Sequence, residues 1–190
     1  MGVRLQMVAR NKQVRQQELT ALIETEPFLT DEELAERFAV SVQTIRLDRL
    51  ALGIPELRER IKAVANNNYG KVRSLELTEV IGELIELDLN HLAISILEIG
   101  PEHIFTRTKI ARGHHLFAQA NSLAVSVIDA EVVLTGTADV RFTRQVKLGE
   151  RLISKAVVVD NREDRACVDV ATKVGDDIVF EGQFVVFKNK

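Results

Sequence analysis

Apolar residues along this chain first recur with a helical period and later follow the pattern of strands. Over residues 10–53 they return every three or four positions, as in Leu19 and Ile23, which predicts a group of helices. The segment Thr30-Asp31-Glu32-Glu33 has the sequence of a capping box and predicts the start of a second helix. Ser41 follows a short break and predicts the N-cap of a third helix.

Residues 54–70 predict one amphipathic helix that links two domains. Pro55 suits the first helical position, because an N–H there would have no partner within the helix. An apolar seam is formed by Leu57, Ile61 and Val64. Basic residues are predicted to project away from this seam, namely Arg58, Arg60 and Lys62. Two interpretations stay open for this face, contact with DNA or the solvated side of a packing helix, and both hold if the helix changes partners.

The rest of the chain predicts strands around one buried helix. Runs rich in Val, Ile, Thr and Phe, separated by turn residues, predict strands over residues 91–99, 130–142, 150–159, 166–174 and 178–188. Residues 114–128 are apolar nearly all round and predict a buried helix. A long antiparallel sheet around one helix is the plan of a hot-dog fold. The predicted fold class is therefore α+β, with a helix-turn-helix domain over 1–54, a linker helix over 55–70 and a hot-dog domain over 71–190.

The composition of this 190-residue chain, with 46% hydrophobic and 28% charged residues, is ordinary for a globular protein. No apolar run approaches the roughly 18–20 residues that span a bilayer, so no membrane partner is expected. The single Cys167 excludes a disulfide within the chain and favours a cytoplasmic location. With one Cys and four scattered His, no metal site is expected.

Charge is distributed unevenly behind the formal net charge of −3. Residues 1–73 hold twelve Lys and Arg against ten Asp and Glu, a net +2. Residues 74–190 hold thirteen against eighteen, a net −5. A mildly basic N-terminal region followed by an acidic region suits a protein that binds a polyanion only through its N-terminal region.

Residues 34–50 have the spacing of a helix-turn-helix motif. Ala35 is small where two helices cross, Val40 fills the turn, and Ile45 anchors the second helix to the core. Position 39 more often carries Gly in such motifs, so Ala39 predicts a slightly different turn. The spacing indicates DNA binding, and the alternative is an ordinary three-helix bundle with a solvated charged face.

The polar residues of the third predicted helix suit contact with DNA. Val42, Ile45 and Leu50 are predicted to face inward, which leaves the polar residues outside. Arg can bridge guanine edges, Gln can pair with adenine, and Thr or Arg can hold phosphate oxygens. Together with the helix start and the linker, the predicted DNA-binding set is Ser41, Gln43, Thr44, Arg46, Arg49, Arg58, Arg60 and Lys62.

Arg112-Gly113 stands where the buried helix is predicted to begin. A Gly there lets a ligand approach the backbone closely, and the N–H groups of the helix start attract negative charge. Arg112 is suited to a two-pronged pair with a carboxylate. Asn121 is polar in an otherwise apolar helix and needs a hydrogen-bond partner. The alternatives are a surface salt bridge for Arg112 and a hydrogen bond to a neighbouring strand for Asn121.

No catalytic residues are predicted. The adjacent His114 and His115 point roughly 100° apart on a helix, so they do not face one substrate or share one metal. Acyl-CoA thioesterases and dehydratases with a hot-dog fold need a positioned carboxylate or His. Residues 112–128 contain no Asp or Glu, so such an enzyme is kept only as the alternative function.

Several of these segments closely resemble the FapR family, bacterial repressors of fatty acid and phospholipid synthesis. The resemblance covers Phe28–Ala65, including Ser41–Arg49 and Ile54–Lys62, and continues through Arg112-Gly113 and Asn121 into the closing strands. It implies a homodimer that binds operator DNA and is released by malonyl-CoA. It also implies malonyl-acyl carrier protein as a related effector, and no cofactor.

The resemblance further implies roles for single positions. The carboxylate of the effector meets Arg112, and Gly113 and Asn121 line the same pocket. Phe105 packs beside this pocket, and Leu134 lies where added bulk would block the response to effector. The linker helix is implied to lie on DNA in the repressing state and on the C-terminal domain when effector is bound.

Overall fold

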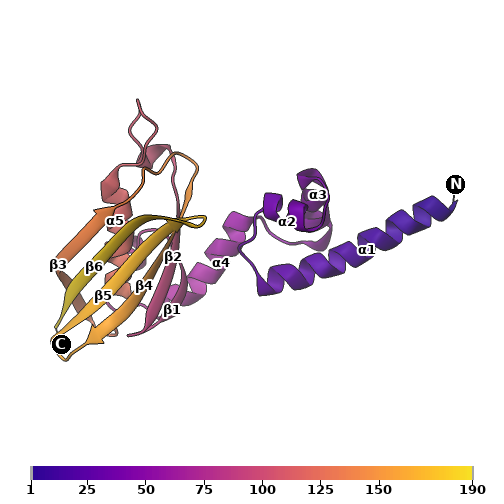
Figure 1. Cartoon of the computed structure of the whole chain (residues 1–190). Helices are drawn as coiled ribbons and strands as arrows, with labels where there is room; N and C mark the ends of the chain where they lie inside the picture. Colours follow the sequence, from indigo (N-terminus) through magenta and orange to yellow (C-terminus); the bar gives the residue numbers. More distant parts are fainter. Residues whose placement is uncertain (1, 190) are drawn as a thin grey trace. The chain divides into compact units, whose positions relative to one another are not determined.

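The computed structural model describes residues 2–189, except for the side chains of residues 2–11, 66, 67, 69 and 77. The chain forms two compact units, one up to Ala63, called the head below, and one from Val64 onward, called the C-terminal domain (Figure 1). The division falls inside helix α4 (Leu57–Tyr69), which covers most of the predicted linker helix. The predicted three-part division, with boundaries after residues 54 and 70, stays a prediction.

The head is helical, as its apolar period predicts. Three helices precede α4, namely α1 (Gly2–Thr25), α2 (Asp31–Arg37) and α3 (Val42–Leu52). Their shared core consists of Leu19, Ile23, Leu34, Ala35 and Ile45. No helix of the described residues is both long enough and apolar enough to cross a membrane.

Side-chain caps fix where α2 and α3 begin. Thr30 Oγ1 accepts the Glu33 N–H at 3.0 Å, and the Glu33 carboxylate accepts the Thr30 N–H at 2.7 Å. Ser41 Oγ accepts the Thr44 N–H at 3.2 Å. The predicted capping box and the predicted N-cap are both confirmed. Each cap satisfies N–H groups that the first helical turn leaves without a partner.

The turn between α2 and α3 keeps the conformation that glycine usually supplies. Ala39 has a φ of 50°, in the left-handed region, so the predicted change of turn is wrong. A side chain in this region costs about 1–2 kcal/mol through the contact of Cβ with the carbonyl oxygen. The helices on either side impose this turn. Alanine has the smallest side chain after glycine, so Ala39 adds the least bulk to it.

The variant Ala39→Gly is therefore expected to stabilise the head by about 0.5–1 kcal/mol, because relief of the Cβ contact outweighs the extra entropy of glycine. Urea denaturation followed by the helical circular dichroism signal measures the change. Gly53→Ala is the matched control, since Gly53 ends α3 with a φ of 67° and should lose stability. A destabilised Ala39→Gly variant would contradict the strain at this turn.

The C-terminal domain is a six-stranded antiparallel sheet with one helix against it (Figure 1). The strand order is β1-β2-β4-β5-β6-β3, so β1 and β3 are the edges. The strands are β1 (Glu83–Asp88), β2 (Leu92–Glu98), β3 (Val132–Phe142), β4 (Arg151–Asn161), β5 (Arg165–Val174) and β6 (Asp177–Asn189). Helix α5 spans Gly113–Ser126, and two short 3₁₀ helices span Leu77–Glu79 and Pro101–His103. This arrangement confirms the predicted sheet around one central helix.

Strand β1 is absent from the sequence prediction. Its residues, Glu-Leu-Ile-Glu-Leu-Asp, are mostly Leu and acidic side chains, which have little preference for strands. Pairing with β2 overrides this weak local preference, with Leu87 opposite Ala93. The edge strand is therefore determined by its neighbour rather than by its own residues.

A row of hydroxyl groups crosses the inner face of the sheet. Ser95, Ser154 and Thr172 are register partners on β2, β4 and β5, and all three are fully buried. The hydroxyls of Ser154 and Thr172 lie 2.8 Å apart, and Gln119 Nε2 of α5 donates to Ser95 Oγ at 3.1 Å. Rotation of α5 about its axis would leave these buried polar groups unpaired, so they fix the face that the helix presents to the sheet.

Candidate functional site

Helix α3 exposes a different face from the one predicted. Ile45, Asp48 and Arg49 are buried, and Arg49 is only 4% exposed. Leu50 is 75% exposed. The predictions of an outward Arg49 and an inward Leu50 are therefore wrong. The reason is that charged partners on the neighbouring helices hold Asp48 and Arg49 inside, and residue 50 lies about 100° further round the helix.

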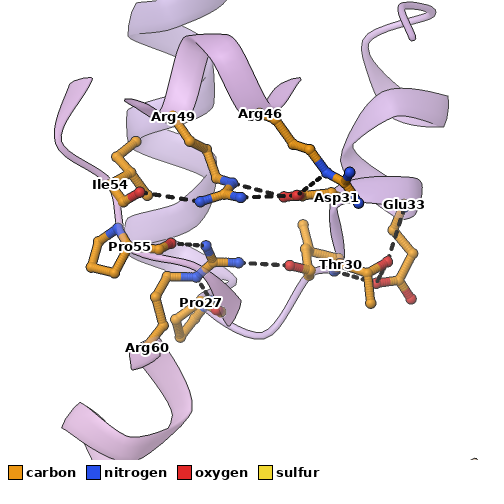
Figure 2. A network of polar contacts seen from close by, with 10 residues as sticks. Pro27, Thr30, Asp31, Glu33, Arg46, Arg49, Ile54, Pro55 and Arg60 are labelled. Carbon is orange, nitrogen blue, oxygen red and sulfur yellow. Dashed lines mark hydrogen bonds and ion pairs between the residues drawn. The ribbon is translucent and has the colours of Figure 1, made fainter. Parts of the chain in front are cut away.

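Arg49 is held by a carboxylate of the neighbouring helix α2 (Figure 2). Its Nε and Nη2 donate to the two oxygens of Asp31 at 2.7 and 2.9 Å, and its Nη1 donates to the Ile54 carbonyl at 3.2 Å. The more exposed Arg46 places its Nε 3.4 Å from the same carboxylate. Burial by itself raises the pKa of Asp31, yet Arg49 and then Arg46 hold that pKa below its ordinary value. Arg49 fixes α3 to α2 and is not free to read bases.

Helix α1 supplies the partners of Asp48. Arg15 Nε donates to one oxygen at 2.6 Å, and Gln16 Nε2 donates to the other at 2.8 Å. Burial opposes the charge of Asp48, but these hydrogen bonds hold its pKa below the ordinary value. Helix α3 is therefore tied to α1 as well as to α2, which fixes its orientation in the head.

Arg60 is buried, contrary to the prediction that it projects from the linker helix. Its side chain turns into the head, and its residue exposure is 7%. The guanidinium donates to the carbonyls of Pro27, Pro55 and Leu29 at 2.9, 2.6 and 2.8 Å (Figure 2). Burial lowers the pKa of Arg60, and the charge of nearby Arg49 lowers it further. Helical periodicity does not reveal this role, because the acceptors come from loops outside the helix.

The other predicted DNA-binding residues with basic or amide side chains are accessible to solvent. Gln43 and Arg46 are exposed on α3, and Arg58 is exposed on α4. Lys62 is partly exposed, with Nζ 3.6 Å from a carboxylate oxygen of Glu59. Such exposed pairs contribute little to stability, so these side chains are available to phosphates or base edges.

The start of α3 joins this accessible set. Ser41 caps the helix by accepting the Thr44 N–H, and the hydroxyl oxygens of the two residues lie 2.9 Å apart. Leu47 is largely exposed on the outer face of α3, although nothing in the sequence pattern singled it out. An apolar side chain there suits contact with a thymine methyl group.

In the C-terminal domain Arg112 stands at the N-cap of α5, as predicted. Its backbone N–H donates to the His103 carbonyl at 2.9 Å, and its Nη2 donates to the Glu102 carbonyl. Its Nε is buried and has no hydrogen-bond partner among the described residues. The ion pairs of the described residues include none with Arg112, so the guanidinium keeps donor capacity for an anion.

Three other predicted effector residues lie where α5 passes beside the edge strand β3. A Cβ added to Gly113 would stand 3.2 Å from the ring of Phe142. Asn121 Oδ1 accepts the Thr135 hydroxyl at 2.7 Å, which is the strand hydrogen bond considered as the alternative for this residue. Leu134, the neighbour of Thr135, is 60% exposed. Gly113 and Asn121 thus meet β3 at Phe142 and Thr135, seven residues apart along the strand, and the role of Leu134 in the effector site stays a prediction.

Phe105 comes from the loop that leads into α5. Its N–H donates to the Ile110 carbonyl at 2.9 Å, and its side chain is largely exposed. A bridge between Ile104 and Ala111 returns the chain directly to Arg112. The predicted packing of Phe105 beside the effector pocket stays a prediction.

Three histidines surround the start of α5. The rings of His103 and His115 lie 4.8 Å apart, and those of His114 and His115 lie 4.1 Å apart. His115 Nε2 is buried without a hydrogen-bond partner among the described residues. Burial lowers the pKa of His115, and the charges of His114, His103 and Arg112 lower it further, against a small opposite effect of Glu102. His115 is therefore neutral at pH 7.

This lowered pKa predicts a pH-dependent stability of the C-terminal domain. The unfolded chain takes up a proton on His115 near pH 6.5, whereas the folded chain takes it up only at lower pH. Stability is therefore full above pH 6.5 and is lost as the pH falls from there through the folded pKa. Urea denaturation at several pH values should show a smaller loss in His115→Gln than in wild type. The exposed His91→Gln is the control, and an equal loss in all three proteins would contradict the prediction.

A separate hollow of about 550 Å³ lies on the sheet face that points away from α5. Its polar lining consists of Asp139, Arg141, Lys155, Asp169, Glu181 and Gln183. Its lining contains both acidic and basic groups, and no predicted effector residue lines it. The candidate effector site therefore remains the start of α5.

Comparison with known proteins defines the class of this chain. A family model described as a DeoR-like helix-turn-helix domain matches residues 15–61. An uncharacterized protein from Pyrococcus horikoshii is 27% identical, with a TM-score of 0.58, over 62% of this chain and 92% of that structure. A hypothetical thioesterase from Streptococcus pneumoniae, solved with coenzyme A, shares the fold at 15% identity and a TM-score of 0.52, over 60% and 90% of the two chains. The chain is thus a DNA-binding transcription regulator with a helix-turn-helix head and a hot-dog C-terminal domain.

Curated relatives identify the family. The transcription factor FapR of Bacillus subtilis (strain 168) is 60% identical over 184 residues, which cover 95% of this chain and 98% of the relative. FapR of Bacillus velezensis is 58% identical over the same shares of the two chains. The chain belongs to the FapR family of transcription factors. It is not an enzyme, so the thioesterase or dehydratase alternative is dropped.

Proposed function

We propose that the chain represses genes of fatty acid and phospholipid synthesis and is released from its operator by malonyl-CoA or malonyl-acyl carrier protein. The head would bind the operator through the accessible residues of α3 and α4. The C-terminal domain would bind the effector in the cytoplasm without a cofactor. Effector binding would favour docking of the apolar seam of α4 on that domain and would move the head out of operator register.

The observation that carries this proposal is the state of Arg112. Its guanidinium is held in place by the Glu102 carbonyl, yet its buried Nε lacks a partner among the described residues. It stands at the N-terminus of α5, where the first N–H groups also favour an anion. A ligand with a free carboxylate, such as a malonyl thioester, would satisfy the donor that an acetyl thioester leaves unpaired.

A homodimer is part of the proposal and has its own support. Strand β3 is an edge of the sheet and is 11 residues long, so its outer N–H and C=O groups can pair with another strand. Val132, Leu134 and Phe142 on this strand are exposed apolar side chains. A second copy of the chain that pairs along β3 would cover them and would place two effector sites next to the dimer interface.

The test is a gel-shift titration of the purified full chain on an operator fragment from a fatty acid synthesis gene. Malonyl-CoA should release the DNA, whereas acetyl-CoA and free CoA at equal concentration should not. Moving the equilibrium from 1:99 to 99:1 requires about 5.5 kcal/mol of differential affinity, which two carboxylate sites and the burial of α4 would share. Operator binding that saturating malonyl-CoA leaves unchanged would rule the proposal out.

A further inference from the structure

The buried side chain of Arg60 connects α4 to two loops of the head. Pro27 and Leu29, which accept from Nε and Nη2, lie in the loop between α1 and α2. Pro55, which accepts from Nη1, lies in the loop between α3 and α4. All three guanidinium nitrogens are therefore used, each on a different backbone carbonyl (Figure 2).

The shape of the arginine side chain suits this position. A guanidinium is a planar fork whose donors lie on three nitrogens, whereas all donors of lysine lie on one nitrogen, so arginine matches carbonyls of two separate loops better than lysine does. The hydrogen bonds of the Arg60 guanidinium go to carbonyls and not to a carboxylate, and the nearby carboxylate of Asp31 is already held by Arg49 and Arg46. The charge of Arg60 is thus stabilised by carbonyl dipoles, and removing it would leave three partly buried backbone hydrogen bonds unmade.

The opposite end of α4 is held independently. Asn68 in its last turn donates from Nδ2 to the carbonyls of Ile85 and Leu84 at 2.6 and 3.3 Å, within the C-terminal domain. These are hydrogen bonds of a neutral amide, which are weaker than those of a guanidinium. Arg60 and Asn68 are eight residues apart, so the helix between them carries the connection.

We propose that Arg60 is a positioning residue that makes the first two turns of α4 a fixed part of the DNA-binding head. It sets the direction in which the exposed Arg58 and the partly exposed Lys62 project from the head relative to α3. Any rearrangement on effector binding then bends α4 between Arg60 and Asn68, and the head travels with the first turns of α4 as one body. The inference deepens the proposed function and rests on it, because it takes the head to be the part of the chain that binds operator DNA.

Two independent divisions of the chain agree with this inference. The matched helix-turn-helix domain extends to residue 61 and therefore includes Arg60. The compact unit of the head ends at Ala63, inside α4. Neither division coincides with the helix start at Leu57, where a freely detachable linker would begin.

The first experiment is hydrogen exchange on the full-length wild-type protein, free, with operator DNA and with malonyl-CoA. The amide of Arg60 donates to the carbonyl of Glu56, the residue before α4, at 3.0 Å, and the amides of residues 61–63 follow it in the first turns of the helix. They should exchange as slowly as the amides of α3 and should keep that protection in all three states. Exchange about tenfold or more faster than α3, or protection lost on adding malonyl-CoA, would overturn the inference.

The second experiment compares Arg60→Met and Arg60→Lys with Arg58→Met, which removes the same charge from the exposed side of the same helix. Both Arg60 variants should lose protection at 60–63 and bind operator about tenfold or more weakly. Arg58→Met should keep full protection and lose only about one unit in the slope of log affinity against log salt. If Arg60→Met unfolds the head, Arg60→Lys and the wild-type exchange data decide the question. Arg60→Lys with wild-type protection and wild-type operator affinity would contradict the inference.

The same samples show separately whether the proposed function is wrong. A wild-type protein that binds no operator, or that malonyl-CoA does not release, would refute the repressor model. The exchange of residues 60–63 relative to α3 would still report whether Arg60 fixes α4 to the head. The two proposals are therefore separable within one set of samples.

Discussion

Arg112→Ala is expected to raise the malonyl-CoA concentration needed for operator release about 100-fold. A two-pronged bond between a guanidinium and a carboxylate is worth about 3 kcal/mol when partly desolvated, and alanine removes both prongs. Operator affinity without effector should stay within about twofold of wild type, because Arg112 belongs to the C-terminal domain and the DNA contacts belong to the head. A gel-shift titration with malonyl-CoA measures both quantities on the same protein.

Arg107→Ala is the matched control for this variant. Arg107 is an exposed arginine of the loop that precedes α5, five residues before Arg112. Arg107→Ala removes one positive charge near the site, as Arg112→Ala does, but should leave the effector response unchanged. Should Arg112→Ala respond to malonyl-CoA as wild type does, Arg112 would not be the partner of the carboxylate.

Asp31→Ala is expected to destabilise the head by about 3 kcal/mol and to abolish operator binding. Asp31 supplies the two oxygens that hold Arg49, and both side chains are largely buried. Removing the carboxylate leaves a buried guanidinium that keeps its hydrogen bond to the Ile54 carbonyl but has lost its counter-charge. A buried charge that loses its partner costs far more than the pair contributes in place, which explains the size of the effect. Helix α3 would then lose its fixed angle to α2.

Glu26→Ala tests whether this effect belongs to burial or to any lost ion pair. Glu26 pairs with Arg37 at 2.7 Å in the same head, but both side chains are about half exposed. The control should change stability by less than about 1 kcal/mol. Thermal unfolding followed at a helical wavelength, together with operator gel shifts, compares the two variants. Similar losses in both would show that the buried network has no special role.

The elements with strong local signals were predictable. Thr30 and Ser41 cap α2 and α3 as expected, because capping depends on residues only three positions apart. The buried helix α5 and five strands follow from apolar periodicity. Strand β1 did not, because its Leu and Glu residues adopt a strand only through pairing with β2.

The predictions for the candidate site residues were right or wrong for the same reason. Arg112 was expected at the start of α5 and is found there, since a helix boundary is a local property. Arg49 and Arg60 were expected outside and are buried. Their partners, Asp31, Pro27 and Leu29, lie 18 to 33 residues earlier in the chain, so no local pattern reveals them.

By itself the sequence determined the helical head, the sheet around one helix, the helix caps and the place of Arg112, because each depends on neighbouring residues or on a period along the chain. Only the tertiary structure decided which arginines face DNA and which hold the head together. A charged side chain has no intrinsic inside or outside. Its burial depends on whether distant carboxylates and carbonyls converge on it closely enough to replace water, and that is settled only when the chain is folded.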